Sequence, residues 1–432
     1  MSKRKGALQQ EQCAEQSTPQ ASLLARYRKI RKDSESICKP LQVEDYGLQT
    51  MADVSPPRWH LAHVTWFFET FLLKPYLSDY QEFHPRFAYL FNSYYETVGS
   101  IYPRPQRGFL SRPTTEEIYR YRAYVDEHMQ FLLQNISESR LDEINIRSQV
   151  GLHHEQQHQE LLLTDIKYNF ATNPLCPVYR EQPSVANIPT QDIQWTEHNG
   201  GMVSVGADGA EFCFDNETPR HNTFLHPFRM ASRPVSNGEY MEFMDAGTYD
   251  QVDLWLSEGW KTVKEQQWQA PLYWQKVDDN WYYMTLAGLQ PVDISAPVCH
   301  VSYYEADAYA RWAGKRLPTE FEWEAIASVH DPCKGHFLDS GYYQPGAATG
   351  SGMCQLFGDV WEWTQSPYSP YPGFTPLPGS LGEYNGKFMC SQMTLRGGSC
   401  VTPTNHIRAS YRNFFYPRDR WQYSGIHLAE DA

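Results

Sequence analysis

Apolar residues in the first half of the chain recur at the three- and four-residue spacing of an α-helix. Two such sets are Leu23, Leu24, Tyr27 and Ile30, and Ile118, Tyr121, Tyr124 and Val125. Thr114 and Glu117 stand at the spacing of a capping box, which predicts a helix that begins there and continues to Leu133. The pattern predicts a helical region over residues 21–170, preceded by a disordered N-terminus at residues 1–20.

The second half alternates short strand-like runs with glycine-rich loops, and strands are predicted at 201–206 and 393–396. Three more capping boxes predict helices that begin at Ser236, Ser302 and Thr319, each with a glutamate three residues later. Between the halves, prolines at positions 174, 177, 183 and 189 oppose a helix, so residues 171–195 are predicted to be a linker. Residues 196–432 are then a loop-rich α+β domain, and the chain is a multidomain α+β protein.

Charge and apolar content exclude several classes of protein. The chain of 432 residues has 37 Lys and Arg against 51 Asp and Glu, a net charge of -14, so it lacks the positive field that binds nucleic acids. No apolar run approaches the roughly 18 residues that cross a bilayer, and no apolar segment follows the basic start as in a secretory signal. Nine scattered cysteines form no C-x-x-C pair, which favours reduced thiols and a cytoplasmic protein.

One segment of the helical half carries candidate metal ligands. His154 and His158 are four residues apart, which separates them by only about 40° around a helix and lets both imidazoles reach one metal ion. A third ligand could come from Ser55-Pro-Pro-Arg-Trp-His-Leu-Ala-His. The two prolines predict the start of a helix, and its apolar face would turn His60 or His63 towards the core of a bundle.

The segment His-Glu-Gln-Gln-His that starts at His154 also matches H-E-x-x-H, in which the glutamate is the general base of a zinc peptidase. The metzincin extension is absent, because Gln-Glu-Leu-Leu follows. A zinc-dependent hydrolase that uses Glu155 is therefore the minor alternative.

Beyond these local signals, the chain resembles a known family over nearly its whole length. The segments that carry the resemblance are Ser55-Pro-Pro-Arg-Trp-His-Leu-Ala-His, His154-x-x-x-His-x-Glu, Thr218-Pro-Arg-His, Lys315-Arg-Leu-Pro-Thr-Glu-Phe-Glu-Trp-Glu, Gly358-Asp-Val-Trp-Glu-Trp, Leu395-Arg-Gly-Gly-Ser, Arg412-Asn-Phe-Phe and Trp421-Gln-Tyr-Ser-Gly-Ile-His-Leu-Ala. The first half resembles the DinB-like domain of the hercynine oxygenases, the sulfoxide synthases of ergothioneine biosynthesis. The second half resembles the formylglycine-generating-enzyme, or sulfatase-modifying-factor, domain, which has a C-type-lectin-like α+β fold.

The resemblance implies a non-haem Fe(II) ion held by His63, His154 and His158. Three imidazoles on one face of the ion leave positions for a thiol, an imidazole substrate and O₂. Glu160 points about 160° away from His158 around the helix and is expected to support the site or the structure rather than bind iron. His60 and His153 are expected to be structural.

The resemblance also implies roles for eight other residues. They are Tyr94 and Tyr95 as donors of a proton and an electron, Arg104 and Arg107 as a clamp for the carboxylate of the thiol, and Gln157, Asn413, Phe414 and Phe415 as contacts of the second substrate. Guanidinium forks suit carboxylates, and aromatic faces hold a quaternary ammonium such as that of hercynine, the trimethylated betaine of histidine. From the residues alone, packing tyrosines, solvated arginines and a core strand end stay open as alternatives.

One departure distinguishes related activities. Formylglycine-generating enzymes need a cysteine pair shortly after Gly-Gly-Ser, but Thr402 and Ile407 occupy the expected positions, so sulfatase maturation is disfavoured. The segment 358–363, with Asp359 and Glu362, is a candidate site for structural Ca²⁺, with a packed turn as the alternative.

The sequence therefore predicts an iron- and O₂-dependent sulfoxide synthase that joins cysteine or γ-glutamylcysteine to the imidazole carbon of hercynine. Tyr94 and Tyr95 favour cysteine. No methyltransferase region is expected, so another enzyme would supply hercynine and a separate C–S lyase would process the product. A selenium-donor homologue that makes selenoneine, the zinc-dependent hydrolase and a non-catalytic binding module are the alternatives. Neither nucleic acid nor a membrane is an expected partner, and no feature indicates an oligomeric state.

Overall fold

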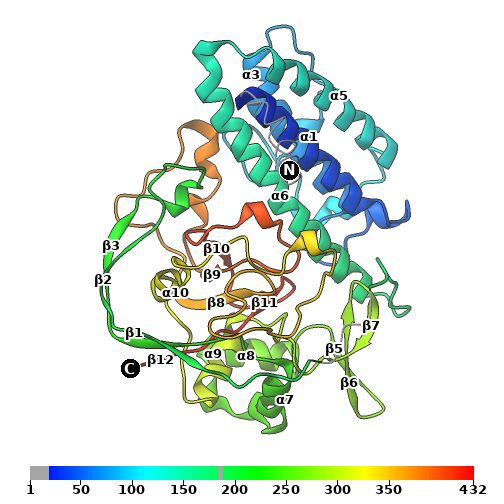
Figure 1. The fold of residues 1–432 in the computed structure, drawn as a ribbon. Helices are drawn as coiled ribbons and strands as arrows, with labels where there is room; N and C mark the ends of the chain where they lie inside the picture. Colours follow the sequence, from blue (N-terminus) through cyan, green and yellow to red (C-terminus); the bar gives the residue numbers. More distant parts are fainter. Residues whose placement is uncertain (1–18, 183–187) are drawn as a thin grey trace, which may run out of the picture.

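The computed structural model describes residues 19–182 and 188–432, and it divides into a helical part and a mixed part (Figure 1). Most of the predicted disordered N-terminus, residues 1–18, lies outside the described residues, and the first helix begins at Pro19.

The first part is a bundle of helices, as predicted. The helices are α1 (Pro19–Cys38), α2 (Pro57–Phe68), α3 (Lys74–Tyr76), α4 (Phe87–Phe91), α5 (Thr115–Gln134) and α6 (Leu141–Ala171). The long helices α1, α2, α5 and α6 pack against one another. Helix α2 runs on through a wider turn of π type at Glu69–Leu73.

Local sequence explains where these helices begin and which face they bury. Thr114 caps α5, because its hydroxyl accepts from the backbone of Glu117 while the glutamate accepts from the backbone of Thr114. Ile118, Tyr121 and Val125 are fully buried against the bundle core, as their spacing predicts.

Gly151 sets how closely α2 and α6 approach each other. A Cβ atom at this position would lie 2.7 Å from Phe68 and 3.0 Å from Phe67, both side chains of α2. Any larger residue would therefore push the two helices apart.

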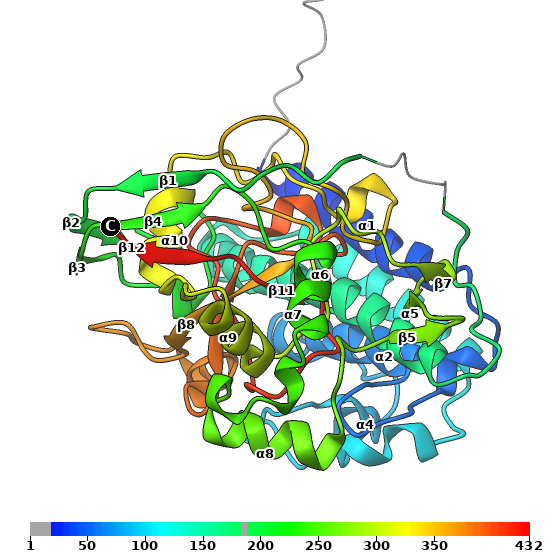
Figure 2. The same cartoon turned by 90° about the horizontal axis from the view of Figure 1, so that it is seen from below.

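The second part is a loop-rich mixture of helices and short strands (Figure 2). Its strands are β1 (Trp195–His198), β2 (Gly201–Val205), β3 (His221–Leu225), β4 (Phe228–Ala231), β5 (Trp274–Val277), β6 (Asn280–Thr285), β7 (Gly288–Pro291), β8 (Trp361–Pro367), β9 (Met393–Arg396), β10 (Asn413–Phe415), β11 (Ser424–Gly425) and β12 (Ala429–Asp431). Its helices are α7 (Asn237–Asp245), α8 (Ser257–Gln266), α9 (Tyr303–Trp312) and α10 (Glu320–Ala327). The predicted capping boxes at Ser236, Ser302 and Thr319 are all formed.

The strands form four small sheets rather than one large one. Their orders are β1-β4-β12, β10-β9-β8-β11, β2-β3 and β5-β6-β7. Within them only β11 pairs in parallel, with β8, and the other pairs are antiparallel. Strand β10 carries Asn413, Phe414 and Phe415 at an edge of its sheet.

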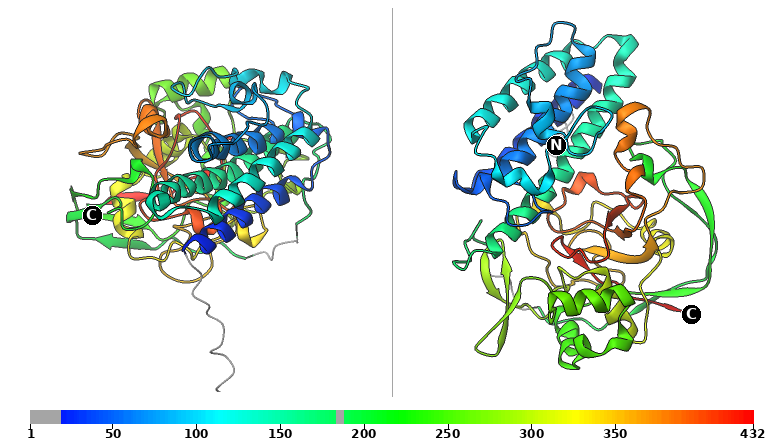
Figure 3. Two further views of the ribbon diagram at one scale, coloured as in Figure 1. Left: turned by 90° about the horizontal axis from the view of Figure 1, so that it is seen from above. Right: turned by 180° about the vertical axis from the view of Figure 1, so that it is seen from behind.

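Helix α6 joins the two parts. It runs along the boundary between them (Figure 3). Its Glu160 carboxylate accepts from Trp361 Nε1 at 2.5 Å and from Thr402 Oγ1 at 2.7 Å, and Ser399 Oγ also donates to it. Glu160 thus supports the packing of the two parts, as expected, and Thr402 uses its hydroxyl for this contact.

Farther along α6, the buried Lys167 donates from Nζ to His300 Nε2 at 2.7 Å. After Ala171 the described residues contain no helix or strand until Trp195. None of the helices in the described part of the chain is long and apolar enough to cross a bilayer.

Candidate metal centre

Three buried histidines converge between α2 and α6. His63 comes from α2, and His154 and His158 come from successive turns of α6. One ring nitrogen of each lies within 4.8 Å of the others. Three imidazoles at this separation can all bind one ion.

Hydrogen bonds prepare these imidazoles to act as ligands. Nδ1 of His63 donates to the carbonyl of Phe91 at 2.5 Å, which leaves a lone pair on Nε2. This Nε2 lies 3.1 Å from Nε2 of His154. Buried nitrogens that face each other in this way need a cation or proton between them, so the donor set fits a metal ion.

Burial also keeps the three rings uncharged. It lowers the pKa of His154 to about 3, although the nearby Glu155 opposes this effect. It lowers the pKa of His63 and His158 well below the ordinary value, and the neighbouring histidines add to the effect. A neutral imidazole is the form that binds metals.

His158 is held by a residue that sequence reasoning treated as structural. Its Nδ1 lies 2.8 Å from Nδ1 of His60, and Nε2 of His60 lies 2.9 Å from Oδ2 of Asp165. His60 therefore touches the candidate metal centre. Its position three residues before His63, and that of Asp165 seven residues after His158, are helical spacings that could have revealed this contact.

Glu155 points away from the three histidines. Its carboxylate is fully buried between Arg31 at 2.9 Å and Arg122 at 2.5 Å, and Ser34 Oγ donates to it at 2.7 Å. Burial alone would raise the pKa of this carboxyl, but the two arginines lower it to about 2. A carboxylate paired in this way cannot serve as the general base of a hydrolase, so the geometry opposes that alternative.

A cavity of about 440 Å³ opens beside the histidines and is lined by both parts of the chain. Its volume is in the range of small-molecule sites. All the predicted site residues line it except His63 and Tyr95, which are buried behind its wall. Those that line it are Tyr94, Arg104, Arg107, His154, Gln157, His158, Asn413, Phe414 and Phe415.

The two arginines differ in their surroundings. Arg104 is exposed and donates to the backbone carbonyl of Asp53. Arg107 is buried, lies 3.4 Å above the ring of Trp59 and donates to Ser55 Oγ at 2.9 Å. Burial, together with the charge of Arg104, lowers the pKa of Arg107. Its Nε has no partner among the described residues, so this N–H group can donate to an anionic ligand.

Gln157 is positioned by two tyrosines that sequence reasoning missed. Its Nε2 donates to Tyr411 Oη at 2.7 Å, and its Oε1 accepts from the hydroxyl of Tyr384. The ring of Tyr384 also lies 5.6 Å from that of His154. Both tyrosines stand in irregular segments of the second part, where no periodic pattern points to them.

Aromatic rings from the second part of the chain also line the cavity and form an aromatic wall. Phe414 stacks on Tyr368 at 4.1 Å and lies 5.9 Å from Phe388, while Phe415 meets Trp421 edge to face. Oδ1 of Asn413 accepts from the backbone of Phe414 at 2.9 Å, which orients the amide. This wall offers ring faces beside an amide group.

The adjacent tyrosines take different positions. Tyr94 faces the cavity and stacks on Tyr95 at 4.6 Å, whereas Tyr95 is fully buried among the aromatic rings of α2 and the turn that follows it. Burial raises the pKa of both phenols, so both hold their protons at neutral pH.

The carboxylates suggested as calcium ligands meet hydrogen-bond donors. Oδ1 of Asp359 accepts from His336 Nδ1 and from the backbone of Gly346, each at 2.9 Å. Glu362 accepts from Trp323 Nε1 at 2.5 Å and lies 2.8 Å from Nδ1 of His427. These contacts match the packed turn that was the alternative.

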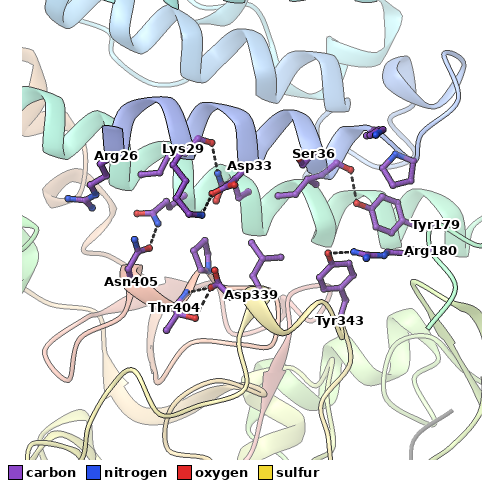
Figure 4. Close-up of a pocket in the computed structure, with 18 residues that line it drawn as sticks. Arg26, Lys29, Asp33, Ser36, Tyr179, Arg180, Asp339, Tyr343, Thr404 and Asn405 are labelled. Atoms are coloured by element: carbon purple, nitrogen blue, oxygen red, sulfur yellow. Dashed lines mark hydrogen bonds and ion pairs between the residues drawn. The ribbon is translucent and has the colours of Figure 1, made fainter. Parts of the chain in front are cut away.

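A second cavity, of about 720 Å³, lies between α1, α6 and loops of the second part (Figure 4). Several of its charged groups are engaged with neighbours: Lys29 pairs with Asp33 at 2.7 Å, and Asp339 accepts from Thr404. Gln156 reaches it from a different face of α6 than the candidate ligands. The larger cavity is thus separate from the three histidines.

Both parts of the chain match known families. Residues 26–162 match the DinB superfamily, and residues 191–347 and 340–432 match the sulfatase-modifying factor enzyme 1-like domain. These are the two families that the motifs of each half indicate.

The chain is also similar to named proteins of other organisms. The chain is 33% identical over 322 residues to a hercynine oxygenase of Mycolicibacterium smegmatis. The match covers 67% of this chain and 73% of that protein. It is 30% identical over 411 residues to a hercynine oxygenase of Mycolicibacterium thermoresistibile, with 88% of each chain covered. It is 28% identical over 231 residues to ergothioneine biosynthesis protein 1 of Schizosaccharomyces pombe, which covers 51% of this chain and 28% of that protein.

Proposed function

The chain belongs to the hercynine oxygenase family, and from that membership we propose that it is a sulfoxide synthase of ergothioneine biosynthesis that uses Fe(II) and O₂. The reaction joins the sulfur of a thiol to the imidazole carbon of hercynine. One oxygen atom of O₂ ends in the sulfoxide, and the other leaves as water with the hydrogens of the S–H and C–H bonds.

The observation that carries the proposal is the placement of three neutral imidazoles against a cavity whose walls match both organic substrates. His63, His154 and His158 would hold the iron. When bound, ferrous iron supplies the one-electron chemistry that lets O₂ react with closed-shell molecules. The described residues contain no fourth protein ligand grouped with these three.

Arg107 and Arg104 would bind the carboxylate of the thiol substrate. Arg107 is a buried cation with no carboxylate paired to it among the described residues, and a substrate carboxylate would supply that partner. The stacking of its guanidinium on Trp59 keeps the group flat against the cavity wall, which orients its remaining N–H bonds.

Gln157, Asn413 and the aromatic wall would bind hercynine. Tyr384 and Tyr411 fix the amide of Gln157, whose second N–H can then donate to an imidazole nitrogen. The rings of Phe414 and Phe415 would face the trimethylammonium group, which cannot donate a hydrogen bond and is held by aromatic faces. The amide of Asn413 would meet the carboxylate.

Tyr94 is the proposed source of the proton, because it faces the cavity and keeps its proton at neutral pH. Tyr384, whose hydroxyl is already bound to Gln157, is the second protonated phenol beside His154. We favour cysteine as the donor on the resemblance of the Tyr94–Tyr95 pair. We also expect a cytoplasmic protein, since all eight cysteines in the described residues are free thiols.

The test is product analysis with iron-loaded protein. We expect protein loaded with Fe(II) under anaerobic conditions to consume O₂ only when hercynine and a thiol are both present. Mass spectrometry should show a sulfoxide with one oxygen atom from labelled O₂. Cysteine, γ-glutamylcysteine and a selenium donor are compared in separate reactions. Equal activity of zinc-loaded protein, or O₂ consumption without C–S bond formation, would contradict the proposal.

A further inference from the structure

Asp165, His60 and His158 form a buried chain of hydrogen bonds that ends at the candidate metal centre. Oδ2 of Asp165 lies 2.9 Å from Nε2 of His60, and Nδ1 of His60 lies 2.8 Å from Nδ1 of His158. All three side chains are at least nine-tenths buried. The chain joins α2 to α6, the two helices that supply the metal ligands.

The direction of these hydrogen bonds follows from chemistry. An ionised carboxylate can only accept, so the proton of the Asp165–His60 contact belongs to Nε2 of His60. In the neutral form of His60, Nδ1 carries a lone pair, and that lone pair accepts the Nδ1 proton of His158. The Nε2 atom of His158 is then left without a proton, and its lone pair is available to a metal ion held with His63 and His154.

We propose that His60 and Asp165 are positioning residues that fix the tautomer and the ring orientation of His158 for metal binding. Each of the other ligands has a simpler arrangement. Nδ1 of His63 donates to the carbonyl of Phe91, and Nδ1 of His154 has no partner among the described residues. His158 is therefore the ligand whose orientation depends on another titratable side chain.

The far end of this chain lies beside the candidate carboxylate clamp. Oδ2 of Asp165 also accepts from the backbone N–H of Ser55 at 2.8 Å, and Oγ of Ser55 accepts from Arg107 at 2.9 Å. Ser55 immediately precedes the two prolines at the start of α2. Asp165 thus fixes the start of the helix that carries His60 and His63, in addition to orienting His60.

The inference rests on the proposed metal centre, but its test measures binding of the metal alone and needs no turnover. The probe is Co²⁺, titrated into metal-free protein against a competing chelator and followed by its visible absorption. His60→Leu, which removes both nitrogens while keeping an apolar side chain, should weaken Co²⁺ binding roughly 10- to 100-fold. Asp165→Asn, which removes the charge, should weaken it several-fold.

A variant that restores the hydrogen bonds of His60 distinguishes a positioning role from simple packing. The amide of glutamine offers an oxygen and an N–H group at about the separation of the two imidazole nitrogens, so His60→Gln should keep affinity within about threefold of the wild type. His153→Leu is the matched control. His153 is also a buried histidine, adjacent to a candidate ligand, but it contacts His406 and stacks on Phe212. The Co²⁺ affinity of the His153→Leu variant should equal that of the wild type.

A second readout reports the tautomer directly. In metal-free protein labelled with ¹⁵N-histidine, His158 should carry its proton on Nδ1, and His60→Leu should shift it towards a mixture of tautomers. Ser55→Ala, which keeps the backbone contact to Asp165, should change neither the tautomer nor Co²⁺ binding.

The proposal would be overturned if His60→Leu bound Co²⁺ as tightly as the wild type, or if His153→Leu lost as much Co²⁺ affinity as His60→Leu. It would also be overturned if His60→Leu left the tautomer of His158 unchanged. Thermal melting of the metal-free variants shows which of them fold. If His60→Leu does not fold, retention of affinity in His60→Gln together with its loss in Asp165→Asn supports the proposal. Loss of Co²⁺ affinity in His60→Gln together with wild-type affinity in Asp165→Asn contradicts the proposal. If the Co²⁺ affinities and the tautomers are as expected but the protein makes no sulfoxide, the proposed reaction is contradicted and the role of His60 is not.

Discussion

At the scale of single residues, Arg107 places a positive charge in the cavity wall, and among the described residues its guanidinium contacts Ser55 and Trp59 while its Nε has no partner. If this charge binds the carboxylate of the thiol, Arg107→Gln should raise KM for the thiol about 10- to 100-fold, the effect of losing charge-assisted hydrogen bonds. Co²⁺ affinity should stay unchanged. Steady-state kinetics with the thiol varied at saturating hercynine measures this effect.

Arg120 on α5 provides the control, because it is exposed and lies outside the cavity. Arg120→Gln should leave KM unchanged. An equal KM in the wild type and Arg107→Gln would show that the thiol carboxylate binds elsewhere.

Glu155 allows a second prediction at this scale. Glu155→Gln removes the carboxylate that Arg31 and Arg122 share, although Arg31 keeps Asp126 and Arg122 keeps Glu35, so we expect the free energy of unfolding to fall by about 3 kcal/mol. The fraction that folds should keep its metal and its activity. Urea denaturation measures the first effect, and specific activity per bound metal measures the second.

Glu116→Gln, a change at an exposed glutamate at the start of α5, is the control for removal of one negative charge. Complete loss of activity in folded, metal-loaded Glu155→Gln would instead support the hydrolase alternative.

Residue patterns in the sequence indicate the candidate ligands more clearly than the residues that hydrogen-bond to them. His154 and His158 stand out because two histidines at helical spacing share one face. His60 and Asp165 obey the same rule, yet each is isolated in sequence from its partner, and only the packing of α2 on α6 brings them together. Tyr384 and Tyr411 have no such signal, since tertiary contacts alone determine the shape of their loops.

At the scale of elements, Gly151 determines the fit between α2 and α6, the two helices that carry the candidate ligands. Gly→Ala inside a helix ordinarily stabilises a protein by about 0.5–1 kcal/mol. Here the added methyl group would meet Phe68 at 2.7 Å, so we expect Gly151→Ala to destabilise the protein by about 1–3 kcal/mol. It should also weaken Co²⁺ binding, because His63 and His154 move apart.

Thermal denaturation and Co²⁺ titration test both effects. Gly346→Ala is the control, since a Cβ atom there meets nothing within 4 Å. A stabilised Gly151→Ala variant would show that α2 and α6 can separate without cost.

Helix starts could be predicted from sequence with accuracy. The boxes at Thr114, Ser236, Ser302 and Thr319 are all formed, because each depends on two residues that are close in sequence. The sheet order was not predictable in this way. Strands such as β11 and β12 are two and three residues long and gain their partners only from distant segments.

At the scale of the whole molecule, Lys167 couples the bundle to the second part through a buried ammonium group. Burial lowers its pKa from 10.5 to about 8. Between these values the unfolded chain holds a proton that the folded protein has lost, so the free energy of unfolding rises with pH. We expect a gain of about 2 kcal/mol from this group between pH 7 and pH 9.5.

Urea denaturation at pH 7 and pH 9.5 measures this increase in the free energy of unfolding. The wild type should show it, and Lys167→Met should not. Lys261→Met, a change at an exposed lysine of α8, should behave as the wild type. An identical pH dependence in the wild type and Lys167→Met would show that Lys167 titrates normally.

The order of the segments along the chain would affect how the candidate metal centre acquires an ion. Helices α2 and α6 lie before residue 172, whereas the aromatic wall and the tyrosines that hold Gln157 come from the second part. On a ribosome, the three imidazoles can therefore meet roughly tens of seconds before the rest of the nascent chain covers them. Because zinc binds imidazole more tightly than ferrous iron does, the free metal pool during translation should decide which ion becomes trapped.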